Sequence, residues 1–259
     1  MKIEFRRMLY SRGFYTAVLV MVIAQFIGGY QELWFGFTVG MESGLPYGYF
    51  LDAFRTSLSS NIIMFSIPFL SSLPYSTSFL EDISGGYIKF YLPRKGRKQY
   101  IKDRIFINAI SGGLCADFAI FISITLFALL FKPLENLPEI PLLQEQSTLL
   151  HQQCFAFLLE KLYLFFLCGC FWATIGALIG TVNMNRYLSY LSPFIVYYLL
   201  IIFTERYFLD CYILNPKEWL FPQQTWPFGV LGLSFIIILL CISMMIIFAF
   251  LLNRRIQDV

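Results

Sequence analysis

The last apolar stretch of the chain reads FGVLGLSFIIILLCISMMIIFAFLL from Phe228 to Leu252, and it contains no charged residue. A helix that crosses the hydrocarbon core of a bilayer needs about 20 mostly apolar residues, and this stretch exceeds that length. Arg254 and Arg255 follow after Asn253, as basic residues do at the cytoplasmic end of a spanning helix. The sequence therefore predicts a membrane-spanning helix near the C-terminus.

Five earlier stretches are also long and apolar, near residues 14–30, 58–80, 105–131, 154–182 and 187–203. Hydrophobic residues make up 58% of the chain and charged residues 14%, against about 25% charged in an average soluble domain. Mean hydropathy is +0.67. These values exclude an ordinary soluble protein. We expect a single all-α integral membrane domain over residues 1–259, with six transmembrane helices and no nucleotide-binding domain.

The lysines and arginines are divided unevenly between the two sides of these spans. Of the 19 in the chain, all but five fall in the N-terminal segment, the second and fourth loops and the C-terminal segment. The five on the other side are Arg55, Lys132, Lys161, Arg206 and Lys217. Because short loops rich in Lys and Arg remain in the cytoplasm, both termini are expected there, in a multi-pass protein of the cell membrane.

Residues 1–13 combine basic and apolar side chains in a helical pattern. Phe5, Met8 and Leu9 share one face, away from Arg6 and Arg7. Such a helix lies in the interface of the inner leaflet. The alternative is an ordinary basic flank that anchors the first span.

The chain between the fifth and sixth spans is rich in aromatic residues and is interrupted by Pro216, Pro222 and Pro227. Trp and Tyr favour the membrane interface, and non-helical backbone at membrane depth needs protein around it. We expect short re-entrant helices before the sixth span. The alternative is an aromatic belt at the membrane surface.

The sequence offers little for catalysis. Its one histidine is His151, in a polar stretch, so neither a His-based zinc site nor a Ser-His-Asp arrangement can be centred in the membrane. No Gly-x-x-x-x-Gly-Lys-[Ser/Thr] phosphate loop is present, so the chain does not itself bind ATP in that way. We expect no enzymatic activity, no metal, no cofactor on this chain and no nucleic-acid partner.

Asp117 is the clear ionisable residue inside a predicted span. Intramembrane carboxylates are costly and are functional candidates by default. Asp117 is therefore a candidate intramembrane polar site, with a plain hydrogen-bonded or protonated carboxyl as the alternative.

Small residues recur on one face of the fourth span, at Gly169, Ala173, Gly176, Ala177 and Gly180. Small residues at such spacing allow another helix to approach closely. We expect packing within the chain here, with a subunit interface as the alternative.

The loop after the second span is the most distinctive polar segment. Glu81 and Asp82 close that span, an aromatic and aliphatic segment runs to Pro93, and a dense basic run leads into the third span. We expect Pro93 to break the short segment. Aromatic residues beside so many charges predict a structured cytoplasmic piece with a docking face. The alternative is a basic anchor that also binds anionic lipid.

In this loop the chain resembles the permease subunits of type-2 ABC exporters. Their loop between spans two and three runs from an acidic residue through glycine and an aliphatic turn to Leu-Pro, basic residues and Lys. The same order appears here as Glu81, Gly85, Leu92-Pro93, Arg94 to Lys98, and Lys102. The amphipathic first helix, the six spans and the broken segment before the last span also resemble that family.

The resemblance implies a transport subunit that forms the translocation path. Two permease subunits, as a homodimer or heterodimer, would pair in the bilayer, and two ATPase subunits carrying ATP and Mg would dock on their cytoplasmic side. The ATPase-coupling residues that it implies are Glu81, Asp82, Gly85, Tyr87, Phe90, Leu92 and Arg94. Because the spans are rich in Phe, Tyr, Leu and Ile, we expect export of hydrophobic or amphipathic cargo, such as amphipathic or antimicrobial peptides.

Two other classes of protein are alternatives. An ion-coupled secondary transporter usually has more buried carboxylates and an internal repeat. An intramembrane enzyme needs convergent polar groups inside the spans, and Asp117 has no evident charged partner in the sequence. The ABC permease remains the preferred prediction.

Overall fold

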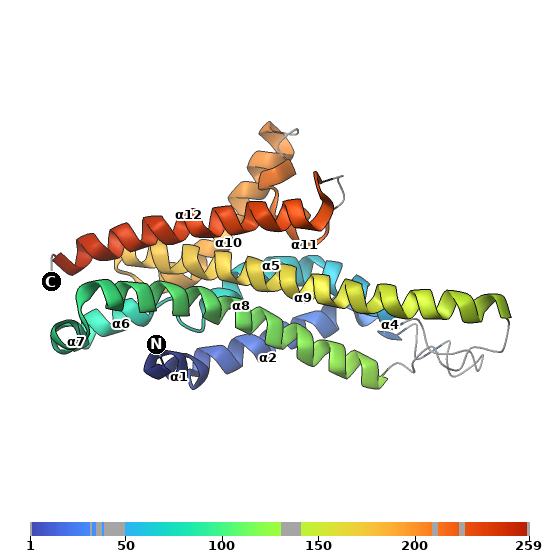
Figure 1. The fold of residues 1–259 in the computed structure, drawn as a ribbon, viewed down its shortest axis with the longest axis horizontal. Coiled ribbons are helices and arrows are strands. Elements are labelled where there is room, and N and C mark those ends of the chain that lie inside the picture. Colours follow the sequence, from blue (N-terminus) through green and yellow to red (C-terminus); the bar gives the residue numbers. More distant parts are fainter. Residues whose placement is uncertain are drawn as a thin grey trace.

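The fold is taken from a computed structural model of the chain. The structure describes residues 2–31, 33–34, 38, 50–130, 141–208, 212–222 and 226–257. Every regular element within these ranges is a helix (Figure 1). The predicted all-helical class is therefore confirmed. His151 lies in a part of α9 whose side chains are not described.

Four long helices are apolar enough to cross a membrane. They are α8 (Arg97–Leu130), α9 (Pro141–Asn183, with its apolar part from Phe155), α10 (Arg186–Ile202) continued by the π-helical turn η2 (Phe203–Tyr207), and α12 (Gly229–Gln257). A fifth results if α1 (Lys2–Leu9) and α2 (Arg12–Gly28), which meet at 44°, form one bent span. The described residues thus form a multi-pass helical membrane protein by length and hydropathy, with four or five such helices.

The second predicted span is not one continuous helix. Residues 58–80 are divided among the end of α4 (Phe50–Ser59), α5 (Asn61–Ser72), a turn, and the start of α6 (Ser78–Ser84). Ser60 is extended between α4 and α5, and Pro74, which lacks an N–H, follows α5. The 12 residues of α5 rise about 18 Å, less than the roughly 30 Å of a hydrocarbon core. The expectation of a single helix here is therefore wrong.

Helix α9 lies at the centre of the bundle. It packs against α8, α12, α10 and α5, and its Phe165 and Trp172 are fully buried. In the 18-residue apolar stretch of α9, 67% of the residues are buried inside the molecule, whereas in the apolar stretch of α12 only 22% are buried. Helix α12 therefore presents most of its apolar surface outward, as a helix in contact with lipid or another subunit does.

The short helices α6 and α7 (Tyr87–Lys95) lie at one end of the bundle, together with α1, the start of α8 and the end of α12 (Figure 1). We refer to this as the α7 end. Pro93 was expected to break the short segment, but α7 continues through it and ends at Gly96, whose φ of 78° favours glycine. The expectation for Pro93 is therefore wrong.

Two further short helices lie between α10 and α12. They are the 3-10 turn η3 (Tyr212–Leu214) and α11 (Pro216–Leu220). Trp219 of α11 is buried against Phe171 and Trp172 of α9, and its indole N–H donates to the Ile213 carbonyl at 2.8 Å. The predicted broken segment therefore contains short helices packed on the bundle.

Candidate functional site

A mostly buried group of ionisable side chains joins four segments at the α7 end. We call it the charged cluster, and it consists of Glu4 and Arg7 of α1, Tyr75 of the turn after α5, Asp82 of α6, and Tyr100 and Arg104 of α8. Glu4, Asp82 and Arg104 are each at most 4% exposed. The four segments that carry these residues are separated in the sequence and meet only in the fold.

Arg104 is the centre of the charged cluster. Its guanidinium pairs with Asp82 and lies 3.4 Å from Glu4 Oε2. It also donates to the Tyr75 hydroxyl at 2.5 Å. The rings of Tyr75 and Tyr100 lie 5.3 and 5.2 Å from the guanidinium carbon, a distance at which an aromatic face attracts a cation. One buried cation therefore holds α8 to α1 and α6.

The two carboxylates receive further hydrogen bonds. Tyr75 donates to Glu4 Oε2 at 2.7 Å, and Tyr100 donates to Asp82 Oδ2 at 2.8 Å. Arg7 donates to Asp82 Oδ1 at 2.8 Å and to Glu81 Oε2 at 3.1 Å. A buried ion pair of this kind is costly to break, because removing one partner leaves the other charged, buried and unpaired.

The electrostatics of the charged cluster favour an ionised Glu4. Burial by itself raises the pKa of Glu4, but the Arg104 guanidinium and the Tyr75 hydroxyl outweigh burial and hold that pKa below its ordinary value. Glu4 is therefore a carboxylate at neutral pH, and α1 is tied to α8 by an ionic contact.

Helix α7 has an inner and an outer face. Ile88 is 2% exposed and packs with Phe79, Phe248 and Leu252, and the half-buried Tyr91 and Leu92 lie beside it. On the outer face, Tyr87 is 64% and Phe90 is 74% exposed, and Arg94 is exposed as well. The 3- and 4-residue spacings of a helix produce this division. Helix α7 is thus anchored on one side and presents two aromatic rings on the other.

The seven residues predicted to couple to an ATPase differ in how exposed they are. Tyr87, Phe90 and Arg94 lie on the outer face, while Asp82 is internal to the charged cluster. Glu81 is half-buried and pairs with Arg7. The structure therefore brings these residues to one end of the molecule but leaves few of them free to contact a partner. Their coupling role stays a prediction.

Leu92 packs against the buried residues around Ile88, and Gly85 lies in the turn that precedes α7. A Cβ on Gly85 would lie 2.8 Å from the Tyr87 ring, and the Gly85 N–H donates to the Glu81 carbonyl at 2.9 Å. The next residue, Gly86, has a φ of 68°, a left-handed conformation that suits glycine. The Gly-Gly pair makes the tight turn that sets the direction of α7 after α6.

The small residues of α9 face other helices of the same chain. A Cβ on Gly169 would lie 2.5 Å from the Gly112 carbonyl of α8, and one on Gly176 would lie 2.6 Å from the Ser189 carbonyl of α10. Gly180 also faces Ser189. Ala173 and Ala177 are buried beside them. Contacts within the chain therefore cover this face of α9.

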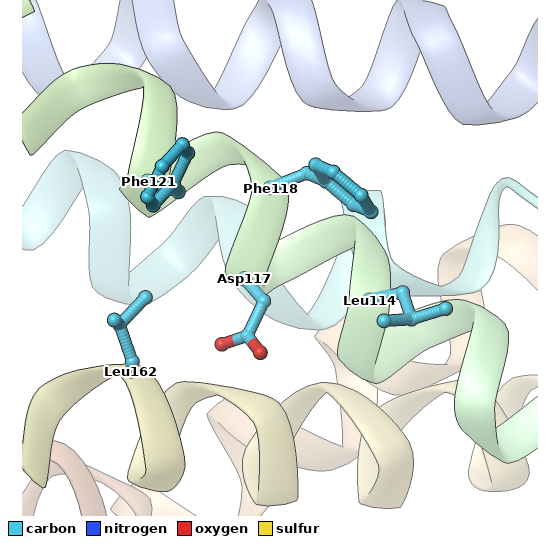
Figure 2. Close-up of a pocket in the computed structure, with 5 residues that line it drawn as sticks. All are labelled: Leu114, Asp117, Phe118, Phe121 and Leu162. Carbon is cyan, nitrogen blue, oxygen red and sulfur yellow. The ribbon is translucent and has the colours of Figure 1, made fainter. Parts of the chain in front are cut away.

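Asp117 lines a cavity between α8 and α9 (Figure 2). The cavity has a volume of about 320 Å³, and its other walls are Leu114, Phe118, Phe121 and Leu162. Figure 2 shows the carboxyl group pointing from α8 toward α9. Its Oδ1 atom is buried and accepts no hydrogen bond within the described residues.

Lys161 is a buried charge that the sequence pattern assigned to the outer side. It lies in α9, is 3% exposed, and donates to the Leu220 carbonyl at the end of α11 at 2.8 Å. Its ammonium lies 4.4 Å from the centre of the Phe221 ring and 3.5 Å from Glu160. Lys161 therefore attaches the short helix α11 to the central helix. Its position inside the fourth predicted span is the sequence signal for this burial.

Comparison with models of known protein families gives no match, and comparison with curated proteins and with solved structures gives none either. Among the described residues, no group of three or more His, Cys, Asp or Glu side chains is placed to hold a metal ion.

Proposed function

We propose that this chain is the permease subunit of a type-2 ABC exporter, with six crossings and both termini in the cytoplasm. The observation that carries the proposal is the outer face of α7. Tyr87 and Phe90 are largely exposed there, on a short helix whose other side is anchored in the bundle. Exposed aromatic residues rimmed by basic ones are typical of a protein interaction site.

The charged cluster supports a mechanical role for this end of the molecule. Asp82 and Arg104 connect α6 to α8, and Glu4 connects α1 to the same arginine. A force applied to α7 would pass through α6 to Arg104 and so to the long helix α8. The ATPase subunits would supply that force by binding ATP and Mg, and the translocation path would form between two permease subunits.

The apolar surface of the long helices supports a membrane partner and hydrophobic cargo. Phe235, Ile246 and Phe250 of α12 are each more than 60% exposed. Such surface requires lipid or a second permease subunit around it. Cargo that also has apolar surface, such as an amphipathic peptide, would be exported along this apolar surface.

Co-purification from the native cells tests the proposal. The tagged chain should retain an ATP-binding-cassette ATPase, identified by its peptides and by ATP hydrolysis in the eluate. Replacing Tyr87 and Phe90 by Asp should reduce the ATPase recovered by about tenfold or more, because these rings would be central to the contact. The matched control is Tyr207→Asp, an exposed aromatic residue of η2.

Two outcomes contradict the proposal. One is equal ATPase recovery with the Tyr87 and Phe90 variants. The other is complete transport by the isolated chain, driven by an ion gradient without any ATPase. The second outcome would favour the ion-coupled alternative, for which Asp117 is the strongest structural support.

A further inference from the structure

The cavity beside Asp117 lies deep within the length of α8. Asp117 is 13 residues after Arg104 and 13 before Leu130, the last residue of the helix. At 1.5 Å per residue, about 20 Å of helix separates the carboxyl group from either position. A ligand that reaches it must therefore enter the apolar interior of the membrane, which a lipid headgroup at the surface does not do.

The walls of the cavity are apolar and partly aromatic. Leu114, Phe118 and Phe121 lie on the same face of α8 as Asp117, and Leu162 comes from α9. Phe118 packs edge-on against Phe14 of α2, with ring centroids 6.0 Å apart. Phe118 is 45% and Phe121 is 60% exposed, so the cavity opens on the outer surface of the bundle.

Asp117 is the one charged residue that lines this cavity. Its Oδ1 atom is buried and accepts no hydrogen bond from the described part of the chain. A buried polar atom without a partner is costly, and the cost is greater for a charged group. A positive charge on a ligand would compensate it, and phenylalanine faces also attract cations.

We propose that this cavity binds a lipophilic cation, a single positive charge carried on an apolar body, with Asp117 as its counter-ion. The volume of about 320 Å³ is at the lower end of ligand pockets, which run from about 300 to 1,000 Å³. The inference deepens the proposed function. It rests on that function only in one respect, which is that the bound cation is treated as transported cargo. The cargo would then be cationic as well as amphipathic.

Equilibrium binding of radiolabelled tetraphenylphosphonium to the purified chain in detergent tests the site without any ATPase. We expect saturable binding that unlabelled tetraphenylphosphonium displaces. Tetraphenylborate has the same shape and the opposite charge, so it should not displace the label. Asp117→Asn should weaken binding by about tenfold or more, because it removes a counter-ion from an apolar site.

Two more variants complete the test. Leu162→Trp should also weaken binding, because it fills the cavity while Asp117 stays in place. Glu205→Gln, which alters an exposed carboxylate of η2, should bind as the wild type does. The Leu162 variant keeps the test valid if Asp117→Asn does not fold.

Three results overturn the inference. They are the absence of saturable binding by the wild type, unchanged binding by both the Asp117 and Leu162 variants, and equal displacement by tetraphenylborate. The absence of saturable binding would mean that the Asp117 carboxyl group binds only a proton. Binding of the cation by the purified chain, combined with failure of the tagged chain to retain any ATPase from the native cells, would overturn the proposed function and leave this site standing.

Discussion

Arg104 of α8 and Asp82 of α6 form an ion pair in which both side chains are almost completely buried. The pair lies where the long helix α8 begins its apolar run and where the segment leading to α7 leaves the bundle. Tyr100 donates to the same carboxylate, and Glu4 lies on the other side of the same guanidinium. One contact thus joins the α7 end to the membrane-spanning part.

Asp82→Asn should destabilise the protein strongly. The substitution leaves Arg104 buried without its main counter-ion, and breaking a buried pair in this way costs about 3–5 kcal/mol. Thermal unfolding of the purified protein in detergent measures the effect. Glu81→Gln is the control, because Glu81 is 44% exposed and its pair with Arg7 is worth at most about 1 kcal/mol. Equal stability of the two variants would show that the buried pair does not hold this end together.

Acid should weaken the attachment of α1. The folded-state pKa of Glu4 lies below its ordinary value of 4.5, so the unfolded chain binds the proton more readily. The contribution of Glu4 is therefore present above about pH 4.5 and is lost as pH falls through the folded-state pKa. Unfolding curves of wild type and Glu4→Gln between pH 3 and 6 should converge at the acidic end. A constant difference across that range would contradict this assignment.

Lys161→Met should release α11 from the central helix. Methionine keeps much of the apolar contact with Phe221 but cannot donate to the Leu220 carbonyl. Hydrogen exchange at Trp219 and Leu220 should accelerate by about tenfold, since tenfold corresponds to about 1.4 kcal/mol. Lys217→Met is the matched control, because Lys217 forms an exposed pair with Glu205. Equal exchange in both variants would rule out Lys161 as the attachment point.

Gly169→Val should separate α8 from α9. A Cβ at this position would already meet the Gly112 carbonyl at 2.5 Å, and valine adds two methyl groups to that contact. Overpacking of this kind costs about 1–3 kcal/mol. Ala128→Val, on an exposed face of α8, adds similar volume and should leave the unfolding temperature nearly unchanged. A stable Gly169 variant would mean that the two helices have room to move apart.

The sequence predicted those features that depend on local pattern. The apolar run from Phe228 to Leu252 forms most of α12, and the loop after Asp82 forms the short helices at the α7 end. The break of the second span at Ser60 was not predicted, because Ser and Asn also occur inside continuous apolar helices. Whether a helix continues through them depends on how the neighbouring segments pack, which the local sequence does not reveal.

The charged cluster was missed for a different reason. Glu4, Asp82 and Arg104 belong to separate elements, and no local spacing relates them. Lys161 was counted with the residues of the outer side, although it lies inside the fourth predicted span, and the carbonyl that accepts its hydrogen bond is 59 residues away. Contacts between distant segments are set by packing, which periodicity does not reveal.

Site-specific photo-crosslinking at α7 identifies the molecule that contacts its outer face. A photoreactive phenylalanine analogue is introduced in the native cells at Phe90, which is 74% exposed, or at Ile88, which is 2% exposed on the opposite face. We predict a cross-link from position 90 to an ATP-binding-cassette ATPase and none from position 88. Cross-links from position 90 to lipid alone, with the protein active in transport, would contradict the claim that α7 is the docking helix of an ABC permease.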